Sequence, residues 1–249
     1  MKILGVIPAR YASTRFPGKP LAILNNKYVI QHVVERVSKV IDNVYVATDD
    51  NRIKTAVESF GGNAIMTRSD HKSGTDRVAE VVNKLNKEYD IIINIQGDEP
   101  FIAESQIRTL IDCFKDNNTQ IATLGKPFDS LTAAKNPNSP KIILDNNKFA
   151  MLFTRSLVPF IRNKEEKDWI NSYPFLKHIG IYAYRLNVLK EITSLPQTTL
   201  ELAESLEQLR WLQYGYKIKV ALTNIETIGI DTPNDLIKAE SVIDNDSSM

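Results

Sequence analysis

Two short segments of the sequence carry charged side chains at spacings that suit phosphate chemistry. The first is a loop that begins at Arg10 and ends at Lys19, with Arg15 as a third cation between them. Guanidinium and ammonium groups bind phosphates and carboxylates through charge-assisted hydrogen bonds. The loop is not a Walker P-loop, because Pro20 follows the lysine where that motif needs Ser or Thr. We expect it to clamp a triphosphate or a carboxylate; the alternative is a solvated basic loop.

The second segment reads Gln-Gly-Asp-Glu-Pro over residues 96–100 and offers the carboxylate of Asp98. Mg²⁺ takes oxygen ligands and usually binds together with substrate phosphates, so a carboxylate beside a basic loop suits a metal–triphosphate site. Asp231, which precedes the last predicted helix, is the candidate for a second Mg²⁺ ligand. The alternatives are a plain turn for Asp98 and a helix cap for Asp231.

A third segment, residues 73–77, opens a predicted helix with Ser-Gly-Thr-Asp-Arg. The free N–H groups of a helix N-terminus can bind an anion or the edge of a base. The same residues also suit ordinary capping, with Ser73 or Thr75 as the N-cap. Arg77 lies in the first turn, where the helix dipole disfavours a cation, and this favours a role for Arg77 in ligand binding.

The elements that must position these segments alternate between strands and helices. Strands are predicted over 2–9, 44–48, 64–67, 91–95 and 121–124, and helices over 29–41, 51–60, 75–87 and 105–116. Strands separated by helices imply parallel crossovers, and therefore an α/β sheet covered on both faces. Ligands bind beyond the carboxyl ends of such strands, which selects the loops 10–19, 49–51 and 96–100.

The pattern changes after residues 129–140, which are rich in Pro, Asn and Ser. Segments 142–144 and 149–154 flank Asp145-Asn146-Asn147 and predict an antiparallel hairpin. Strands follow over 178–184 and 218–222, a helix is predicted after Pro233, and a frayed tail is expected over 244–249. Residues 200–214 are predicted to form one helix. Its buried side is expected to hold Leu202, Leu206 and Leu209, and its solvated side Glu204, Glu207, Gln208 and Trp211.

Composition limits the classes of function. The chain has 249 residues, 43% of them hydrophobic, and a formal net charge of +1. This balance makes nonspecific nucleic-acid binding a poor first hypothesis. A single cysteine and three scattered histidines offer no internal disulfide and no zinc motif. No run approaches the ~20 apolar residues needed to cross a bilayer, so we expect a soluble cytoplasmic protein with no membrane partner.

Six segments resemble, in order, the signatures of the 3-deoxy-manno-octulosonate (Kdo) cytidylyltransferases, or CMP-Kdo synthetases. They are Ile7–Leu21, Thr67–Arg77, Asn94–Pro100, His178–Tyr182, Leu206–Arg210 and Gly229–Pro233. The resemblance implies a Rossmann-like nucleotide-diphospho-sugar transferase fold with a mixed sheet. It implies one cytidylyltransferase domain over 1–249, with 130–185 as a smaller, hairpin-containing dimerisation lobe in a homodimer. It also implies transfer of CMP from CTP to Kdo, with release of pyrophosphate, for lipopolysaccharide synthesis.

The resemblance also implies roles for particular residues. Arg10 and Lys19 would neutralise the triphosphate, and Asp98 and Asp231 would bind Mg²⁺; these four are the expected catalytic residues. The nucleotide would be held by Pro8, Ala9, Arg10, Lys19, Ser73, Gly74, Arg77 and Gln96. The sugar acid would contact Arg15, Arg155, His178, Tyr182, Glu207 and Gln208.

Alternatives remain open at this point. The same chemistry could serve 8-amino-3,8-dideoxy-manno-octulosonate, sialic acid or a sugar phosphate. A regulatory module would bind CTP without releasing pyrophosphate. A receiver-like signalling domain would be phosphorylated on Asp49 or Asp50, although the chain is about twice the usual length of such a domain. Neither non-enzyme class accounts for the basic loop, Asp98 and Asp231 together.

Overall fold

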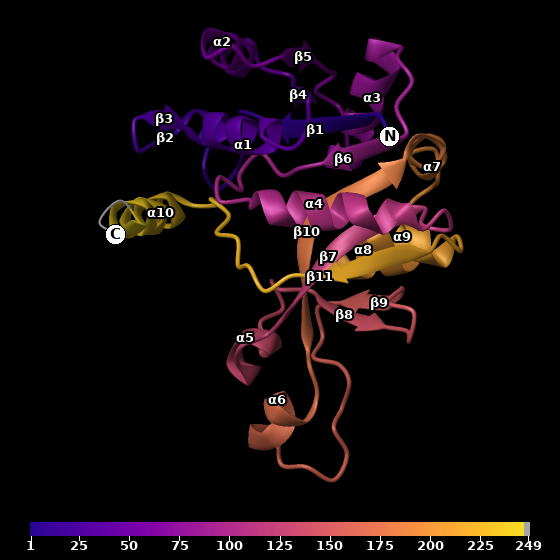
Figure 1. The fold of residues 1–249 in the computed structure, drawn as a ribbon. Coiled ribbons are helices and arrows are strands. Elements are labelled where there is room, and N and C mark those ends of the chain that lie inside the picture. The colour runs from indigo at the N-terminus through magenta and orange to yellow at the C-terminus, as the bar shows by residue number, and fades with distance from the viewer. Residues whose placement is uncertain (247–249) are drawn as a thin grey trace. The chain divides into compact units, whose positions relative to one another are not determined.

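A computed structural model of the protein describes the backbone of residues 1–246 and the side chains of residues 1–241 (Figure 1). The chain forms two compact units. The first consists of residues 1–108 with the segment that starts at Glu226, and the second of Thr109–Ile225. Within the expected tail, residues 244–246 belong to the last helix, whereas 247–249 lie outside the described residues. The predicted limits of the dimerisation lobe stay a prediction.

The first unit is built on four parallel strands in the order β6-β1-β4-β5. Their bounds are β1 (Ile3–Ala9), β4 (Asn43–Thr48), β5 (Ala64–Met66) and β6 (Ile91–Asn94). The helices are α1 (Val29–Ser38), α2 (Asn51–Ser59), α3 (Gly74–Leu85) and α10 (Pro233–Asp246), and α4 (Glu104–Asp112) begins here. A short 3₁₀ turn, η1 (Lys19–Leu21), precedes β2 (Ile23–Leu24) and β3 (Lys27–Tyr28).

The core of the first unit lies between this sheet and its helices. Every residue of β6 is buried, as expected of a parallel strand in an α/β sheet that is covered on both faces. Helix α1 buries the apolar residues that its helical spacing predicted and packs against β1 and β4. It ends at Ser38, three residues earlier than predicted. The predicted parallel crossovers of this half of the chain are confirmed.

The second unit contains a mixed sheet. Strand β10 (Leu176–Arg185) pairs antiparallel with β7 (Ile121–Pro127), while β11 (Ile218–Leu222) pairs parallel with β7. Strands β8 (Lys141–Leu144) and β9 (Ala150–Thr154) form the predicted hairpin, and the Asp145 carboxylate accepts two backbone N–H groups of its turn. The shorter elements are η2 (Cys113–Lys115), α5 (Leu131–Lys135), η3 (Glu166–Asp168), α6 (Trp169–Ser172) and α7 (Leu186–Ile192).

The single helix predicted over 200–214 is wrong. Two helices occupy this stretch, α8 (Thr199–Glu204) and α9 (Gln208–Gln213). Ser205 between them has a φ of 50°, a left-handed conformation that ends α8 and turns the chain. The predicted faces are therefore also wrong, because Leu202 is 60% exposed whereas Gln208 and Trp211 are buried. The prediction that Leu206 and Leu209 are buried is confirmed.

Strand β10 carries an irregularity that matters for the site. Its pairing with β7 moves from Ile179 opposite Leu124 directly to Tyr182 opposite Thr123, so two residues bulge out of the ladder. Residues four apart on a regular strand are about 13 Å apart. The bulge instead brings the rings of His178 and Tyr182 to 5.3 Å between centroids.

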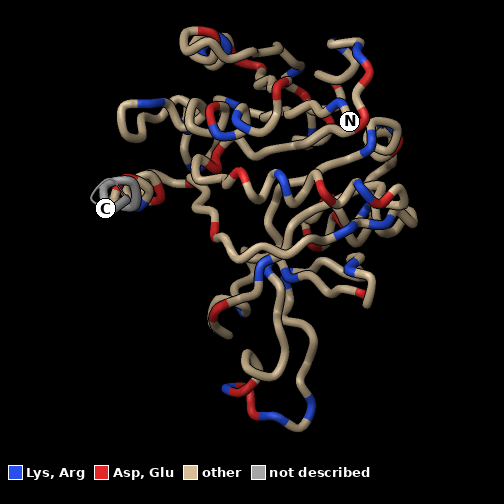
Figure 2. Tube along the Cα trace, viewed as in Figure 1, with Lys and Arg blue, Asp and Glu red and all other residues tan. Residues whose placement is uncertain are grey.

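Basic and acidic residues are interspersed along the chain in both units (Figure 2), and their numbers nearly balance, with a formal net charge of +1. Among the described residues, no helix is both long and apolar enough to cross a membrane.

Candidate functional site

A cleft of about 520 Å³ opens in the first unit at the carboxyl ends of its strands. Every site residue that the sequence predicted in this unit lines it, namely Pro8, Ala9, Arg10, Arg15, Lys19, Ser73, Gly74, Arg77, Gln96, Asp98 and Asp231. Two of the three loops expected to bind a ligand beyond the carboxyl ends of the strands, 10–19 and 96–100, meet at this cleft. The third, 49–51, does not line it. The cleft is also lined by Ala12, Ser13, Thr14 and Gly97, which lie in the two predicted loops but were not singled out as site residues, and by Pro20 and His71, which the sequence did not indicate.

Gly97 allows the acidic segment to lie directly against the end of β1. A Cβ atom added at this position would stand 2.7 Å from the carbonyl oxygen of Pro8, closer than such atoms come in proteins. Any side chain here would push Asp98 and its neighbours away from the basic loop. The glycine therefore determines how close the carboxylate and the cations can lie.

Lys19 forms ion pairs with both predicted metal ligands. Its Nζ contacts the Asp98 carboxylate and lies 3.0 Å from Oδ1 of Asp231. Burial lowers the pKa of Lys19, but the two carboxylates outweigh that effect and raise the pKa above its usual value. The ammonium therefore stays charged across the physiological range. Arg15 adds a second cation, 3.1 Å from Asp231, on a largely exposed side chain.

The Asp231 carboxylate does not cap the last helix. Thr232 and Asp235 do so reciprocally: Asp235 Oδ2 accepts the Thr232 N–H at 2.9 Å, and Thr232 Oγ1 accepts the Asp235 N–H at 3.3 Å. This is a capping-box arrangement. The capping alternative for Asp231 is therefore wrong, and its carboxylate is directed to Lys19 and Arg15 instead.

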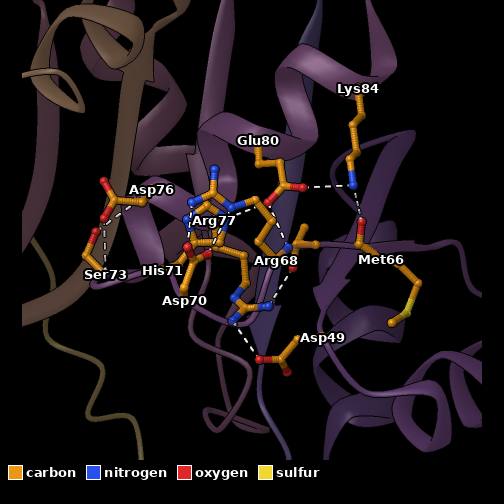
Figure 3. A network of polar contacts seen from close by, with 11 residues as sticks. Asp49, Met66, Arg68, Asp70, His71, Ser73, Asp76, Arg77, Glu80 and Lys84 are labelled. Carbon is orange, nitrogen blue, oxygen red and sulfur yellow. Dashed lines mark hydrogen bonds and ion pairs between the residues drawn. The ribbon is translucent and has the colours of Figure 1, made fainter.

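The N-terminus of α3 combines ordinary capping with a place in the cleft. Ser73 Oγ accepts the Asp76 N–H at 3.1 Å, and Asp76 accepts the Ser73 N–H at 3.2 Å, which confirms Ser73 as the N-cap (Figure 3). Gly74 faces the ring of Pro8, where an added Cβ would have room at 3.7 Å. Ser73 therefore has both a structural function and a position on the cleft wall, and Gly74 lies on the same wall.

Arg77 is buried, with 1% of its surface exposed, and its guanidinium lies 3.1 Å from the Asp49 carboxylate (Figure 3). It also donates to the hydroxyl of Thr67. The unfavourable helix position of this cation is compensated by Asp49, so it does not by itself indicate a ligand. Asp50 accepts the Arg52 N–H at 2.9 Å as the N-cap of α2. Both acidic residues of the receiver-like alternative thus have structural partners.

A polar network that the sequence did not reveal supports one wall of the cleft. The Glu80 carboxylate contacts His71 and accepts from the Arg68 N–H at 2.9 Å and from Lys84 Nζ at 2.8 Å (Figure 3). Burial raises the pKa of Glu80, but the contacts with Lys84, Arg68 and His71 together lower it to about 2. Only the Glu80–Lys84 pair has a sequence signal, its i,i+4 spacing on a helix.

The remaining predicted residues, Arg155, His178, Tyr182, Glu207 and Gln208, belong to the second unit. His178 and Tyr182 lie side by side, and Tyr182 packs edge-on against Trp211 at 5.2 Å between centroids. Tyr182 Oη and Gln208 Nε2 are buried, and neither has a hydrogen-bond partner within the part of the chain described here. Buried polar atoms without partners are unfavourable, and a bound polar ligand can satisfy them.

Burial sets the protonation state of both aromatic groups. It lowers the pKa of His178 to about 3 and raises the pKa of Tyr182 well above its usual value. Both side chains are therefore neutral at physiological pH.

Arg155 makes a different set of contacts. Its guanidinium donates to the carbonyl oxygens of Glu204 at 2.6 Å, Pro137 at 2.9 Å and Ser205 at 3.4 Å. Within residues 1–241 no carboxylate pairs with this guanidinium, so its charge can serve an anionic ligand. Glu207 is bound to Arg210 at 3.1 Å.

The donor set of the cleft fits Mg²⁺ better than a transition metal. Among the described residues, no group of three or more His, Cys, Asp or Glu side chains could hold a metal ion. Asp98 and Asp231 converge on one ammonium, and two carboxylates supplemented by phosphate oxygens are a usual ligand set for Mg²⁺. A bound ion would therefore depend on the nucleotide for part of its coordination.

One cleft brings together cations and paired carboxylates, the groups that a nucleotidyltransferase needs to bind a nucleoside triphosphate with its metal ion. The profile of the family described as "Cytidylyltransferase" matches residues 4–218. The chain belongs to this family, and within it to the 3-deoxy-manno-octulosonate cytidylyltransferases. It is 60% identical over 249 residues to the protein of that name from Parabacteroides distasonis, covering 98% of this chain and 99% of the relative.

Two further comparisons cover almost the whole chain. The structure of CMP:2-keto-3-deoxy-manno-octonic acid synthetase complexed with CTP matches with a TM-score of 0.92 and 43% identity, over 99% of this chain and 100% of the other. A Shewanella baltica protein named 8-amino-3,8-dideoxy-manno-octulosonate cytidylyltransferase is 45% identical over 245 residues, covering 96% of this chain and 98% of that protein.

Proposed function

We propose that this chain transfers CMP from CTP to Kdo, giving CMP-Kdo and pyrophosphate, and that the product serves lipopolysaccharide synthesis. The observation that carries the proposal is the Lys19 ammonium held between Asp98 and Asp231 in a cleft lined by basic residues. Such a cleft suits a triphosphate with an associated cation. The 60% identity to a Kdo cytidylyltransferase over nearly the whole chain supports the choice of acceptor.

The cations of the cleft bind and orient the nucleotide. Arg10, Arg15 and Lys19 all line it, and only Lys19 is largely buried. When a triphosphate enters, its anionic oxygens become further partners for Lys19, beside the carboxylates of Asp98 and Asp231. Ser73, Gly74 and Gln96 line the same cleft from other loops and are the candidates for contacts with the nucleoside.

In the reaction, the 2-hydroxyl of the sugar acid attacks the α-phosphorus of CTP. One P–O bond forms to the sugar, the bond from the α-phosphorus to the bridging oxygen breaks, pyrophosphate leaves with the electron pair, and the proton of the hydroxyl passes to water. The charge that develops on pyrophosphate is stabilised by Lys19 and Arg10, which stay cationic and do not transfer a proton. Mg²⁺, when held by Asp98 and Asp231, would neutralise phosphate charge and ease ionisation of the attacking hydroxyl.

The second unit supplies the groups proposed to hold the sugar acid. The Arg155 guanidinium, which has no carboxylate partner among residues 1–241, suits the carboxylate of the acid. The neutral His178 and Tyr182, with Gln208, suit its hydroxyl groups. Glu207 is proposed to join them.

Release of pyrophosphate tests the proposal. Protein, CTP and Mg²⁺ are combined with Kdo, its 8-amino analogue, sialic acid or no acceptor. We expect release with Kdo alone. Faster release with the 8-amino sugar, the acceptor in the name of the 45% identical Shewanella relative, would keep the cleft and the chemistry but reassign the acceptor. If folded, CTP-binding protein releases no pyrophosphate with any of the three acceptors, the chain is a regulatory module instead.

Asp98→Asn is the matched variant for this assay. The substitution keeps the shape of the side chain and removes its charge, so the fold should persist while turnover is abolished. Near-normal turnover would exclude Asp98 from the metal site. Omission of Mg²⁺ from the wild-type reaction should have the same effect as the variant.

We further propose a cytoplasmic homodimer. The second unit exposes large apolar side chains at Met151, Phe160 and Leu202, and Phe160 is 76% exposed. Exposed apolar groups of this size often mark a protein interface. The lone cysteine and a nucleoside triphosphate substrate both suit a reducing cytoplasm. Light scattering combined with size exclusion should give twice the mass of the 28.2 kDa chain.

A further inference from the structure

The hydroxyl of Thr123 lies at the centre of a small polar group inside the second unit. Thr123 is fully buried, and its Oγ1 is 2.8 Å from the carbonyl oxygen of Ile181 and 3.1 Å from that of Ile179. The same Oγ1 is 3.1 Å from Nε2 of His178. These contacts join strand β7 to the bulge of β10.

The number of available protons fixes the direction of each hydrogen bond. A hydroxyl has one proton to donate and can also accept, whereas a carbonyl oxygen can only accept. The two carbonyls beside Thr123 therefore take its single proton, with the shorter contact to Ile181 as the main bond. The hydroxyl then has only lone pairs to offer His178, so Nε2 must carry a proton and donate it.

We infer that Thr123 is a positioning residue that locks His178 in the Nε2–H tautomer and leaves Nδ1 as a hydrogen-bond acceptor for the sugar acid. The neutral ring has one protonated and one unprotonated nitrogen, so assignment of Nε2 settles Nδ1. Within the described part of the chain, Nδ1 has no hydrogen-bond partner. The bulge sealed by Thr123 also holds His178 beside Tyr182.

The inference rests on the proposed function and adds a chemical constraint to it. An unprotonated Nδ1 can accept from a hydroxyl or an amine but repels a carboxylate. The carboxylate of the sugar acid must then bind elsewhere, and the Arg155 guanidinium is free of carboxylate partners among residues 1–241. His178 therefore accepts a hydrogen bond from a hydroxyl of the sugar acid, and Arg155 binds the carboxylate of the sugar acid. The low pKa of His178, about 3, is consistent with a ring that stays neutral.

Nitrogen-15 NMR of the histidine side chains tests the tautomer directly, without substrate. The chain has three histidines, so selective labelling gives few signals, and the spectrum of His178→Asn assigns those of His178. We expect a protonated Nε2 and an unprotonated Nδ1 between pH 5 and pH 8, with a slowly exchanging Nε2 proton. A protonated Nδ1, or a doubly protonated ring at neutral pH, would overturn the inference whatever the enzyme turns over.

Thr123→Val and Thr123→Ser separate positioning from folding. Valine keeps the shape and removes the hydroxyl, whereas serine keeps the hydroxyl. In Thr123→Val we expect rapid exchange of the His178 ring proton and about a tenfold loss of kcat/KM for the sugar acid, with an unchanged KM for CTP. Thr123→Ser should restore both properties.

Two outcomes would contradict this role. A valine variant with normal kinetics and slow exchange of the His178 ring proton would show that Thr123 does not position His178. The same would follow from a serine variant that folds but has neither the slow ring-proton exchange nor the kcat/KM of the wild-type protein. If the valine variant does not fold, the wild-type and serine spectra still decide the tautomer. Failure of pyrophosphate release with every acceptor, alongside the expected tautomer, would reject the proposed function and leave the proton arrangement intact.

Discussion

At the scale of single residues, Lys19 has the most demanding environment. It is largely buried, and its pKa is raised because two carboxylates face its ammonium. The interaction that raises the pKa stabilises the fold at all pH values below the ordinary pKa of lysine and is lost only as pH rises through the elevated value. The charge proposed to stabilise leaving pyrophosphate is therefore constant over the working range of an enzyme.

Lys19→Met should lower the rate of pyrophosphate release by about 10²–10³-fold, because a preorganised cation at a developing negative charge contributes about that much to catalysis. Lys27→Met is the matched control, since Lys27 forms an exposed ion pair with Glu35 in the same unit. Steady-state assays at saturating CTP should leave the control near the wild-type rate. Equal losses in both variants would point to a general effect of lysine removal.

Glu80 makes a pH-dependent contribution to stability. Its folded-state pKa of about 2 lies below the ordinary 4.5, so the stabilisation is complete above pH 4.5 and is lost as pH falls toward 2. Allowing for solvent screening, we expect wild-type protein to lose about 1–2 kcal/mol more unfolding free energy than Glu80→Gln between pH 5.5 and pH 3. Urea unfolding at the two pH values measures this difference. Parallel losses would show that another group is responsible.

At the scale of elements, local patterns predicted the regular parts and missed the irregular ones. The apolar spacing of α1 and the turn residues of the β8–β9 hairpin are local signals, and both predictions are confirmed. The break at Ser205 has no such signal, because serine is not a usual left-handed residue. The bulge in β10 is likewise stabilised by Thr123, more than fifty residues away. The contacts of Arg77 with Asp49 and of His71 with Glu80 also join separate elements.

Ser205 offers a stability test of the break. Its side chain is exposed and its φ is 50°, a region that costs a residue with a Cβ atom about 1 kcal/mol or more. Ser205→Gly should raise the melting temperature by a few degrees or leave it unchanged, since glycine also gains freedom in the unfolded chain. Ser205→Val should lower it, because a β-branched residue fits this conformation poorly. A more stable valine variant would contradict the left-handed turn.

At the scale of the whole molecule, one topological rule accounts for most of what the sequence predicted about the site. Parallel strands end at a common edge, and the loops that follow β1 and β6 supply the cations and Asp98. Asp231 reaches the same cleft from the far end of the chain. The sequence offered it as a candidate second Mg²⁺ ligand, and the family resemblance implied the same role. The division of the chain into its two units could not be predicted, because it depends on contacts between distant segments.

Ligand binding should be measurable in the stability of the whole protein. CTP with Mg²⁺ at 100 times its dissociation constant adds about 2.7 kcal/mol to the unfolding free energy. For a chain of this size that corresponds to roughly 5–10 °C in melting temperature. Differential scanning fluorimetry should detect the shift with CTP and a smaller one with UTP. In Lys19→Met the CTP shift should largely vanish, and a full shift there would remove Lys19 from the nucleotide site.

The capping of α10 by Thr232 and Asp235, rather than by Asp231, separates folding from function at this helix. Asp231→Asn should therefore melt close to the wild-type temperature while losing turnover. Such a protein is a ready tool for structural work, since it can be mixed with CTP and the sugar acid without consuming them. Crystals of that mixture would capture both substrates intact, a state that the active enzyme converts into products.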